Sequence, residues 1–520
     1  MTLITKTKVD SFNENCENWL GKVVSGFYGY RDAELKPFIE NINSNYEVLF
    51  VNYKNSILGT GGVGTVTREM AKDLHSLKMI CFDHEKNDES IADGRIQLVN
   101  LTIDEIKVFH SSYAKLYLWP VLHGLKTIHS EAEINIFRSN VNSASKKFAI
   151  KAKDVSNDSK KTPIYWINDY VLAQSVGHLR AIDPNSLIIF SWRTSFGDIL
   201  PPKLYAKDRE IIFKSLLKAN FISFHTKKDI RNFVKLFLDH NKDKSIEFDF
   251  EKLAFIDSNS HICYLRAVPM GSNPSYRRSL AGNKHSTENK NKLRTIIDKT
   301  KSAKIITSVS RFELSKGLEY ELDLIESLIQ NNPKIKTSFV FARFSYISEA
   351  KKKSDEYLKQ YDKVMERIKL INDRYKIDNW KPIYVDFTKK LNDSEITDLY
   401  RATDILLVAS LSDGFNHISI EGPLSKVTGL DEPLQLALGR VGSAEYLSNY
   451  TNLGMTHPDK DAEKISIMLK RNPKIIESNF KSLLKSCEKL SSKIWYTSIL
   501  YNVIEPNSVP NILLEEKELL

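Results

Sequence analysis

A chain of 520 residues is too long for one hydrophobic core of ordinary size, so we expect two large domains. Its hydrophobic share of 42% and charged share of 27% are those of an ordinary globular enzyme. The net charge of +10 favours anionic ligands. The excess is spread along the chain without a compact basic arm, which argues against a nucleic-acid partner.

The cysteines and the hydropathy pattern indicate a cytoplasmic protein with no membrane partner. Cys16, Cys81, Cys263 and Cys487 lie far apart, form no metal-ligand spacing, and fit a reducing compartment. The first residues lack the apolar core of a signal peptide, and no apolar run approaches the length that spans a bilayer.

The first part of the chain alternates strand-like and helix-like segments. Residues 1–45 form an N-terminal extension, for which we expect one or two helices. Apolar runs then predict buried strands at 46–51, 163–167, 186–190, 221–224 and 262–268. Their alternation with amphipathic stretches predicts βα units and a largely parallel sheet over residues 46–270. The Ser-, Lys- and Asp-rich residues 142–162 are expected to form a surface loop.

The second part repeats this rhythm. Residues 271–302 begin with Gly-Ser-Asn-Pro and continue into a Lys- and Asn-rich run, so we expect a linker region there. Strand-like runs follow at 304–309, 337–342, 382–386 and 404–411. They predict a second α/β domain over residues 303–490, with residues 491–520 forming a C-terminal segment.

Two cations follow the strand predicted at 304–309. Arg311 and Lys316 stand five positions apart, and Gly317 comes next. In open α/β sheets, ligands bind beyond the carboxyl ends of the strands. Arginine offers a planar fork that matches phosphate, and lysine a mobile point charge. The spacing therefore indicates an anion site, with two solvated loop cations as the alternative.

A second motif follows the strand predicted at 404–411. Asp413 and Gly414 are typical of a turn, and Asn416 is a plausible N-cap for the next helix. Backbone N–H groups at a helix start favour phosphate or sugar hydroxyls. Glu421 lies further along this helix, where its carboxylate could accept hydrogen bonds from sugar hydroxyls. The two motifs together indicate a nucleotide-sugar site.

These motifs carry a family resemblance. Arg-x-x-x-x-Lys-Gly followed by Asp-Gly-x-Asn-x-x-x-x-Glu resembles the donor site of the trehalose-6-phosphate synthases, which are retaining glycosyltransferases of the GT-B fold. The resemblance extends over residues 46–505. Further similar segments lie in the expected order at 60–63, 118–123, 166–170, 380–384 and 442–445.

The resemblance implies a fold and an activity. The fold class is α/β, a GT-B fold of two facing Rossmann-like domains with a cleft between them, and residues 491–505 resemble the family's final helix, which crosses back onto the first domain. The implied reaction moves a hexose, with glucose the first candidate, from a nucleoside-diphosphate sugar such as UDP-glucose to a sugar-like acceptor. The product would be a trehalose-like α-linked glycoside. No cofactor and no metal are expected, and a homo-oligomer is possible.

The resemblance also implies roles on the donor side. Arg311 and Lys316 would stabilise the charge that builds on the leaving diphosphate. Two kinds of contact with the donor are implied. Backbone groups at two glycines and at the start of a helix would lie close to it, and two carboxylates would accept hydrogen bonds from its sugar hydroxyls. The donor-binding residues expected besides the two cations are Gly61, Gly62, Asp413 for the donor sugar, Gly414, Asn416, His417, Ile418, and Glu421 for the ribose.

On the acceptor side the chain departs from the family. Asp169 matches the aspartate that holds the acceptor sugar. Together with Arg311 and Lys316 it is predicted to be catalytic. Trp119 matches a tryptophan of the acceptor pocket. The histidine near the reacting sugars is replaced by Ser191. In the family the acceptor's phosphate is usually held by two arginines, a tyrosine and a tryptophan. The early arginine is replaced by Tyr53, the tyrosine by His110 and the later arginine by Tyr346.

Several explanations of these departures stay open. The acceptor could lack a phosphate at that place, or Lys54, Arg193 and Arg343 could hold an anion from another direction. Loss of the histidine also admits a pseudo-glycosyltransferase that couples cyclitols or amino sugars. A catalytically silent homologue that binds nucleotide-sugar and regulates a partner is the remaining alternative, and the intact donor cations argue against it.

Overall fold

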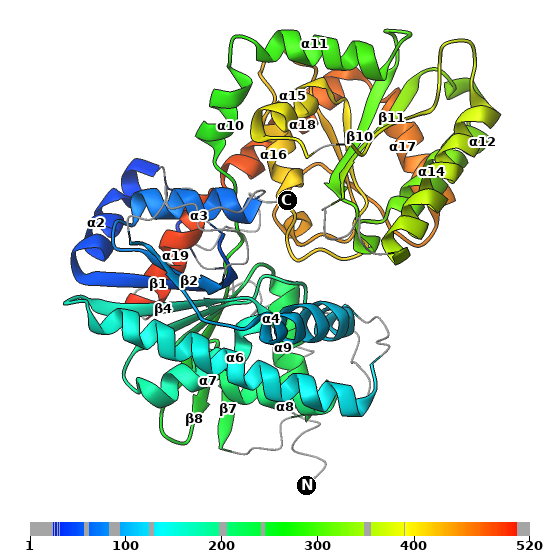
Figure 1. Cartoon of the computed structure of the whole chain (residues 1–520). Coiled ribbons are helices and arrows are strands. Elements are labelled where there is room, and N and C mark those ends of the chain that lie inside the picture. The colour runs from blue at the N-terminus through cyan, green and yellow to red at the C-terminus, as the bar shows by residue number, and fades with distance from the viewer. Residues whose placement is uncertain are drawn as a thin grey trace. The chain divides into compact units, whose positions relative to one another are not determined.

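The computed structural model of the chain describes residues 24, 26–28, 30, 32–56, 62–82, 94–123, 129–196, 205–240, 245–347, 355–388 and 390–506. The chain divides into two compact units. Unit 1 extends to Gly271 and resumes at Ser492, and unit 2 comprises Ser272–Ser491. Each unit is an α/β structure built on one sheet (Figure 1).

The sheet of unit 1 has nine strands in the order β3-β2-β1-β4-β5-β6-β9-β8-β7. Pairing is parallel from β3 to β9, whereas β8 runs antiparallel to both β9 and β7. The strands are β1 (Tyr46–Lys54), β2 (Lys78–Phe82), β3 (Ile96–Leu98), β4 (Thr162–Asn168), β5 (Leu187–Ser191), β6 (Phe221–Phe224), β7 (Ile246–Asp249), β8 (Ala254–Asp257) and β9 (Ile262–Ala267). The predicted largely parallel sheet is therefore confirmed, with an antiparallel hairpin added at one edge.

Most helices of unit 1 connect successive strands of this sheet. They are η1 (Asp32–Leu35), α2 (Lys36–Asn45), α3 (Gly62–Asp73), α4 (Ile103–Ile106), the π-helix η3 (Lys107–Leu118), α5 (Trp119–Leu122), α6 (Glu131–Asn157), η4 (Tyr170–Leu172), α7 (Ala173–Ile182), α8 (Tyr205–Leu216), α9 (Lys227–His240) and α19 (Ser492–Ile504).

Helix α19 belongs to unit 1 although it follows the whole of unit 2 in sequence. Lys493 forms an ion pair of 2.9 Å with Asp73 of α3. The Trp495 ring lies 5.1 Å from the Trp166 ring of β4, and both side chains are buried. An apolar, buried helix of this kind is held by packing, so unit 1 needs the C-terminal segment to complete its core.

Unit 2 contains a six-stranded parallel sheet in the order β12-β11-β10-β13-β14-β15. The strands are β10 (Lys304–Arg311), β11 (Phe339–Tyr346), β12 (Ile383–Asp386), β13 (Ile405–Val408), β14 (Gln435–Leu438) and β15 (Thr451–Asn452). The helices are α10 (Pro274–Ala281), α11 (Ser286–Ile297), η5 (Leu314–Lys316), α12 (Leu318–Asn331), η6 (Pro333–Ile335), α14 (Asp355–Tyr375), α15 (Asp393–Ala402), α16 (Ile418–Leu424), η7 (Gly442–Glu445), α17 (Pro458–Lys470) and α18 (Pro473–Glu488).

Both faces of the unit 2 sheet are buried. Alternate residues of a strand point to opposite faces, and Ile305 and Ile306 of β10 accordingly lie in two different hydrophobic clusters. Strands covered on both faces read as continuous apolar runs. This is why the runs at 304–309 and 404–411 could be predicted as strands from the sequence.

The strand orders give each unit one topological switch point. In unit 1 the chain passes from β1 to β2 on one side, while β4 pairs with the other side of β1. In unit 2 the same reversal occurs between β10 and β13. Ligands of open α/β sheets bind beyond the carboxyl ends of the strands at such points. The segments that follow β1, β4, β10 and β13 are therefore where a site is expected.

Two sequence-based expectations differ from the structure. Residues 142–157 belong to the long helix α6, so the surface loop expected there is wrong for this stretch. The buried face of α6 is made largely of small residues such as Ala144, Ser145 and Ala149, which give a weak hydrophobic signal. The expected linker region 271–302 contains α10 and α11, both within unit 2.

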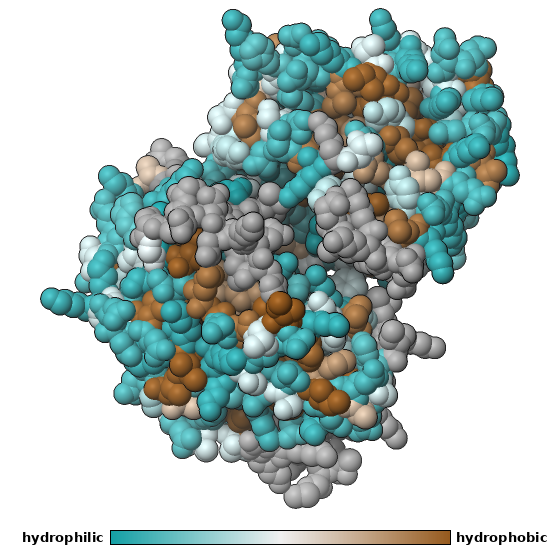
Figure 2. Space-filling view, in the orientation of Figure 1, coloured by the Kyte–Doolittle hydropathy of each residue, from teal (hydrophilic) through white to brown (hydrophobic). Residues whose placement is uncertain are grey.

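Hydrophilic residues cover much of the face seen in Figure 2, with hydrophobic residues interspersed among them. Among the described residues, no helix is both long enough and apolar enough to cross a membrane.

A buried charge in unit 1 generates a stability prediction. Asp208 of α8 is fully buried and accepts hydrogen bonds from Arg138 of α6 and from the hydroxyls of Tyr113 and Tyr117, at 2.9 and 2.6 Å for the tyrosines. Asp208→Asn leaves the Arg138 charge buried without its counter-ion. We expect the free energy of unfolding to fall by about 3–5 kcal/mol in urea titrations followed by tryptophan fluorescence. Asp239→Asn, at an exposed position of α9, should change it little, and equal effects of the two variants would contradict this account.

Candidate active site

The loops after β10 and β13 meet at the switch point of unit 2. The backbone N–H of Leu411 donates to the carbonyl of Ser315 at 2.8 Å. Lys316 Nζ lies 2.6 Å from Asp413 Oδ2, and both side chains are largely buried. The structure thus brings together Lys316 of the first motif and Asp413 of the second, about a hundred residues apart in sequence.

Gly317 makes this close approach possible. Its φ of +70° is in the left-handed region, which glycine adopts without strain. A Cβ atom at this position would overlap the carbonyl oxygen of Ala409 at the end of β13. Glycine is therefore required here both for backbone conformation and for space.

Asp413 is the centre of the second loop. Besides Lys316, its Oδ2 accepts from Asn416 Nδ2 at 3.0 Å. Burial raises the pKa of the Asp413 carboxyl, but Lys316, Asn416 and the N–H of Phe415 together outweigh burial and hold that pKa below its ordinary value. The carboxylate is therefore charged at neutral pH. It is also engaged inside the protein, whereas the sequence predicted a contact with the donor sugar.

The start of helix α16 follows directly. Asn416 adopts a left-handed φ of +78°, and its Oδ1 accepts from the N–H of Ser419 at 3.2 Å. The N-cap position itself is His417, one residue later than predicted. Gly414 is buried in the turn, and His417 and Ile418 are half-buried at the first helical turn. Their contact with a diphosphate remains a prediction.

Arg311 occupies a different environment from Lys316. Its side chain is 71% exposed at the end of β10 and forms a 3.1 Å ion pair with Glu313. In register with it on β11 is Tyr346, one of the predicted acceptor residues. The two predicted cations thus lie on one loop without sharing a partner: Lys316 is fixed and Arg311 is exposed to solvent.

Glu421 has a partner that the sequence did not indicate. Its Oε1 lies 2.6 Å from Arg277 Nη2, and both side chains are buried. Arg277 belongs to α10. The hydroxyl of Ser272 also donates to Glu421 Oε1, at 3.5 Å. One oxygen of Glu421 is therefore held by arginine, which is at odds with a carboxylate left open for ribose hydroxyls.

The predicted glycine pair is only partly placed. Gly61 lies outside the described residues, and Gly62 is the first residue of α3. Their predicted approach to the donor therefore stays a prediction.

Asp169 in unit 1 has a strained backbone. It follows β4 at the switch point with φ 70° and ψ 155°, a combination found almost only in glycine, which costs about 1–3 kcal/mol. Its Oδ1 accepts from the N–H of Tyr170 at 2.9 Å and from Thr194 Oγ1 at 3.2 Å. Burial raises the pKa of the Asp169 carboxyl above its ordinary value, although Tyr170, Arg193 and Thr194 oppose the rise. Strain of this kind concentrates at functional sites.

Arg193 follows β5 and is held by two rings. Its guanidinium carbon lies 5.4 Å from the centre of the Phe50 ring and 5.2 Å from that of Trp495. Burial lowers the pKa of Arg193 to about 10, and the nearby Asp169 opposes this, so the group is positive at neutral pH. Among the described residues its buried Nε has no hydrogen-bond partner. The sequence singled out Arg193 but gave no sign of Phe50 and Trp495, because Trp495 is about three hundred residues away.

Aromatic contacts surround Tyr53, which stands where the resemblance implies an arginine. The Tyr53 ring lies 4.9 Å from the His110 ring, and His110 is 7% exposed. Trp119 is half-buried and stacks on His123 at 4.0 Å. Tyr53 and His110 thus fill space beside the carboxyl end of β1 without contributing a fixed positive charge.

Two predicted candidates are buried and have partners within the protein. Ser191 is 2% exposed, and its hydroxyl accepts from Trp166 Nε1 and contacts Ser223 Oγ, both at 2.7 Å. Arg343 is 1% exposed and lies 2.9 Å from Glu321, so it is not available to an acceptor anion. These placements are at odds with the acceptor role expected for Ser191 and with the alternative that included Arg343. Lys54 is exposed at the end of β1.

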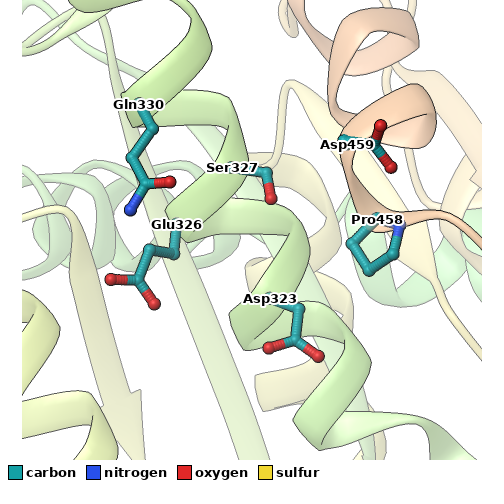
Figure 3. Close-up of a pocket in the computed structure, with 6 residues that line it drawn as sticks. All are labelled: Asp323, Glu326, Ser327, Gln330, Pro458 and Asp459. Carbon is teal, nitrogen blue, oxygen red and sulfur yellow. The ribbon is translucent and has the colours of Figure 1, made fainter.

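A surface pocket on unit 2 does not match these residues. It has a volume of about 280 Å³ and is lined by residues of α12 and of the start of α17 (Figure 3). The lining residues are Asp323, Glu326, Ser327, Gln330, Pro458 and Asp459. Three carboxylates would repel a diphosphate, so we do not place the donor there.

The fold has close counterparts among solved structures. A UDP-forming alpha,alpha-trehalose-phosphate synthase from Burkholderia xenovorans superposes with a TM-score of 0.75 at 19% identity, covering 89% of this chain and 99% of that one. The N-terminal domain of a trehalose-6-phosphate phosphatase from Candida albicans gives 0.76 at 19% identity, covering 93% and 100%. The fold is therefore that of the GT-B glycosyltransferases, as predicted.

The family follows from the sequence comparison. The model of glycosyltransferase family 20 matches residues 62–504, and the chain belongs to this family. The resemblance to the trehalose-6-phosphate synthases is thereby confirmed, and the protein is a glycosyltransferase. Two relatives are a glucosylglycerol-phosphate synthase of Picosynechococcus sp. and an alpha,alpha-trehalose-phosphate synthase of Dictyostelium discoideum. The first is 25% identical, covering 67% of this chain and 70% of the relative; the second is 23% identical, covering 74% and 50%.

Gly317 provides a stability test of the loop contact. Gly317→Ala introduces both an unfavourable φ and an overlap with Ala409, so we expect a larger loss of unfolding free energy than strain alone, which is about 1–2 kcal/mol. Gly429→Ala is the matched control, because Gly429 has a φ of +82° and open space around its Cβ position. Equal losses in urea titrations of the two variants would show that the contact with Ala409 does not matter.

Proposed function

We propose that this glycosyltransferase moves a hexosyl group, with glucose the first candidate, from a UDP-sugar to a sugar-like or polyol acceptor with retention of configuration. The bond from the anomeric carbon to the diphosphate breaks, a bond to an acceptor hydroxyl oxygen forms, and the hydroxyl proton is released. Negative charge builds on the departing diphosphate. Donors fixed in advance near that charge lower the barrier.

The observation that carries the proposal is the meeting of the two loops at the switch point of unit 2. Lys316 is held there by Asp413, and Arg311 lies on the same loop with an exposed side chain. A planar guanidinium that can leave Glu313 is suited to a diphosphate, and a fixed ammonium adds charge beside it. The names of the relatives, which include UDP-forming synthases, support UDP as the nucleotide.

On the acceptor side we propose Asp169 as the group that holds the reacting sugar. Its strained backbone and its three donors from the Tyr170 and Arg193 backbones and the Thr194 side chain fix the carboxylate. Arg193 is the described cation beside it. An acceptor without phosphate would need neither arginine of the family pattern, whereas an anionic acceptor would meet Arg193.

The proposal is tested by measuring nucleoside diphosphate release. UDP-, GDP- and ADP-glucose are each offered glucose-6-phosphate, glycerol phosphate, glucose, amino sugars or polyols. We expect release with UDP-glucose only when an acceptor is present. Arg311→Ala should lower kcat by about 100- to 1000-fold. Arg374→Ala, which alters an exposed arginine of the same unit, should leave kcat unchanged.

The outcomes separate the alternatives. Turnover only with uncharged acceptors would show that Tyr53, His110 and Tyr346 mark a change of specificity. Turnover with a phosphorylated acceptor would assign the anion to Arg193 and Lys54. Nucleotide binding without turnover for every pair would overturn the proposal in favour of a silent homologue or a pseudo-glycosyltransferase.

Metal independence is a second part of the proposal. Lys316, fixed by Asp413, and the exposed Arg311 can together supply the positive charge that a divalent ion would otherwise provide. Among the described residues no group of three or more His, Cys, Asp or Glu side chains has the arrangement of a metal site. We expect kcat to stay within about twofold after dialysis against EDTA. A loss of activity that Mg²⁺ restores would contradict this.

A cytoplasmic location completes the proposal. It rests on the sequence pattern of the cysteines; Cys81, Cys263 and Cys487 are buried in the structure. Buried thiols of this kind are inert and fit a reducing compartment.

A further inference from the structure

A buried ion pair lies beneath the loop that carries Arg311 and Lys316. Glu321 of α12 and Arg343 of β11 have side chains that are each 1% exposed. Arg343 Nε lies 2.9 Å from Glu321 Oε2, without the alignment of a hydrogen bond. Charges are rarely buried so completely in proteins.

The pair contacts both stems of the loop. On the strand side, Ser308 Oγ donates to Glu321 Oε1 at 2.5 Å, and Arg343 Nη2 donates to Ser310 Oγ at 2.7 Å. On the helix side, the N–H of Glu321 donates to the carbonyl of Gly317 at 2.9 Å. We refer to Glu321, Arg343, Ser308 and Ser310 as the brace.

The brace reaches Arg311 through its backbone. Ser310 Oγ donates to the Arg311 carbonyl at 2.9 Å, and Arg343 Nη1 donates to the Phe344 carbonyl at 2.8 Å. Arg343 therefore ties β11 to the last residues of β10. Lys316 lies between this anchor and Glu321, so both cations are carried by a segment that the brace holds at its two ends.

Stability alone does not account for the pair. Desolvating two charges costs as much as their attraction returns, and a well-packed apolar pair is often as stable or more stable. Burial raises the pKa of the Glu321 carboxyl to about 7 in spite of Arg343, and it lowers the pKa of Arg343. An apolar pair would fill the space but could not hold Ser308, Ser310 and the carbonyl groups in place.

We propose that Glu321 and Arg343 are positioning residues that set the places of Arg311 and Lys316 for the donor diphosphate. The proposal rests on the proposed function. In this proposal the buried pair does not touch the donor. It keeps the loop that carries Arg311 and Lys316 in the geometry that transfer requires. Displacements of about 1 Å at a catalytic group can cost about a hundredfold in rate.

The test replaces the pair by apolar residues. Glu321→Leu with Arg343→Met leaves no buried charge, so the double variant should fold with an unfolding free energy at or above that of the wild type. We expect its kcat for transfer to fall between about tenfold and a hundredfold, and its Kd for UDP, measured by calorimetry, to rise several-fold. Arg343→Lys keeps the charge but has a single nitrogen, so its kcat should lie between those of the wild type and the double variant.

A matched control lies in the same turn of α12. Glu319 pairs with Lys363 at 3.1 Å, and both side chains are exposed. Glu319→Leu with Lys363→Met removes an ion pair of the same helix without touching the loop stems. Its kcat and its Kd for UDP should equal those of the wild type.

The outcomes distinguish the brace from the proposed function. A stable double variant with wild-type kcat and wild-type Kd would overturn the positioning role while leaving the proposed function intact. If the wild type binds UDP without transfer and the double variant binds it more weakly, the proposed function fails and the positioning role stands. If the wild type binds no nucleoside diphosphate at all, both fail. A double variant that loses stability as well as activity would also overturn the proposal, because the pair would then act on folding.

Discussion

The close approach of two backbone segments at the switch point of unit 2 is the constraint on which the candidate site depends. The end of β13 and the start of α12 come so near that only glycine fits at position 317. This approach allows Ser315 to pair with Leu411, and it sets Lys316 opposite Asp413. The order of the strands makes the approach possible, because β10 and β13 are neighbours although about a hundred residues separate them. A side chain at position 317 would push the two loops apart and would separate Lys316 from Asp413.

The two donor cations differ in how they are held. Lys316 is largely buried with its carboxylate, so its position is fixed by the fold. Arg311 is exposed and pairs with Glu313, an exposed contact worth at most about 1 kcal/mol. A diphosphate can displace such a partner at little cost, whereas the Lys316–Asp413 pair can persist beside it. We therefore expect Lys316 to provide a standing positive potential and Arg311 to move onto the phosphate.

The sequence could predict local structure and the loops that follow strands, but not the partners of buried charges. Apolar runs such as 304–309 are strands because both faces of the sheet are covered. Helix α6 was missed over residues 142–157, since most of the buried side chains there are alanine and serine. The Glu321–Arg343 and Glu421–Arg277 pairs had no local signal, because each joins residues from separate elements and places charges where composition predicts apolar side chains. The sequence showed the motifs of the candidate site. It did not show the buried charged residues that pair with members of these motifs or lie beneath them.

The acceptor side is where the residues of this chain depart from the pattern that the family resemblance implies. The Tyr53 ring lies 4.9 Å from the His110 ring beside the end of β1, so aromatic surface stands where the resemblance implies an arginine. Among the described residues, Arg193 supplies positive charge beside Asp169, and its guanidinium lies against the Phe50 and Trp495 rings. Aromatic rings stabilise a guanidinium without using its hydrogen-bond donors, so those donors remain for a ligand. Since Trp495 belongs to α19, this environment exists only once the C-terminal helix has packed onto unit 1. If Arg193 meets the acceptor as we propose, we expect recognition of the acceptor to depend on completion of the unit 1 core, which no single motif of the sequence could reveal.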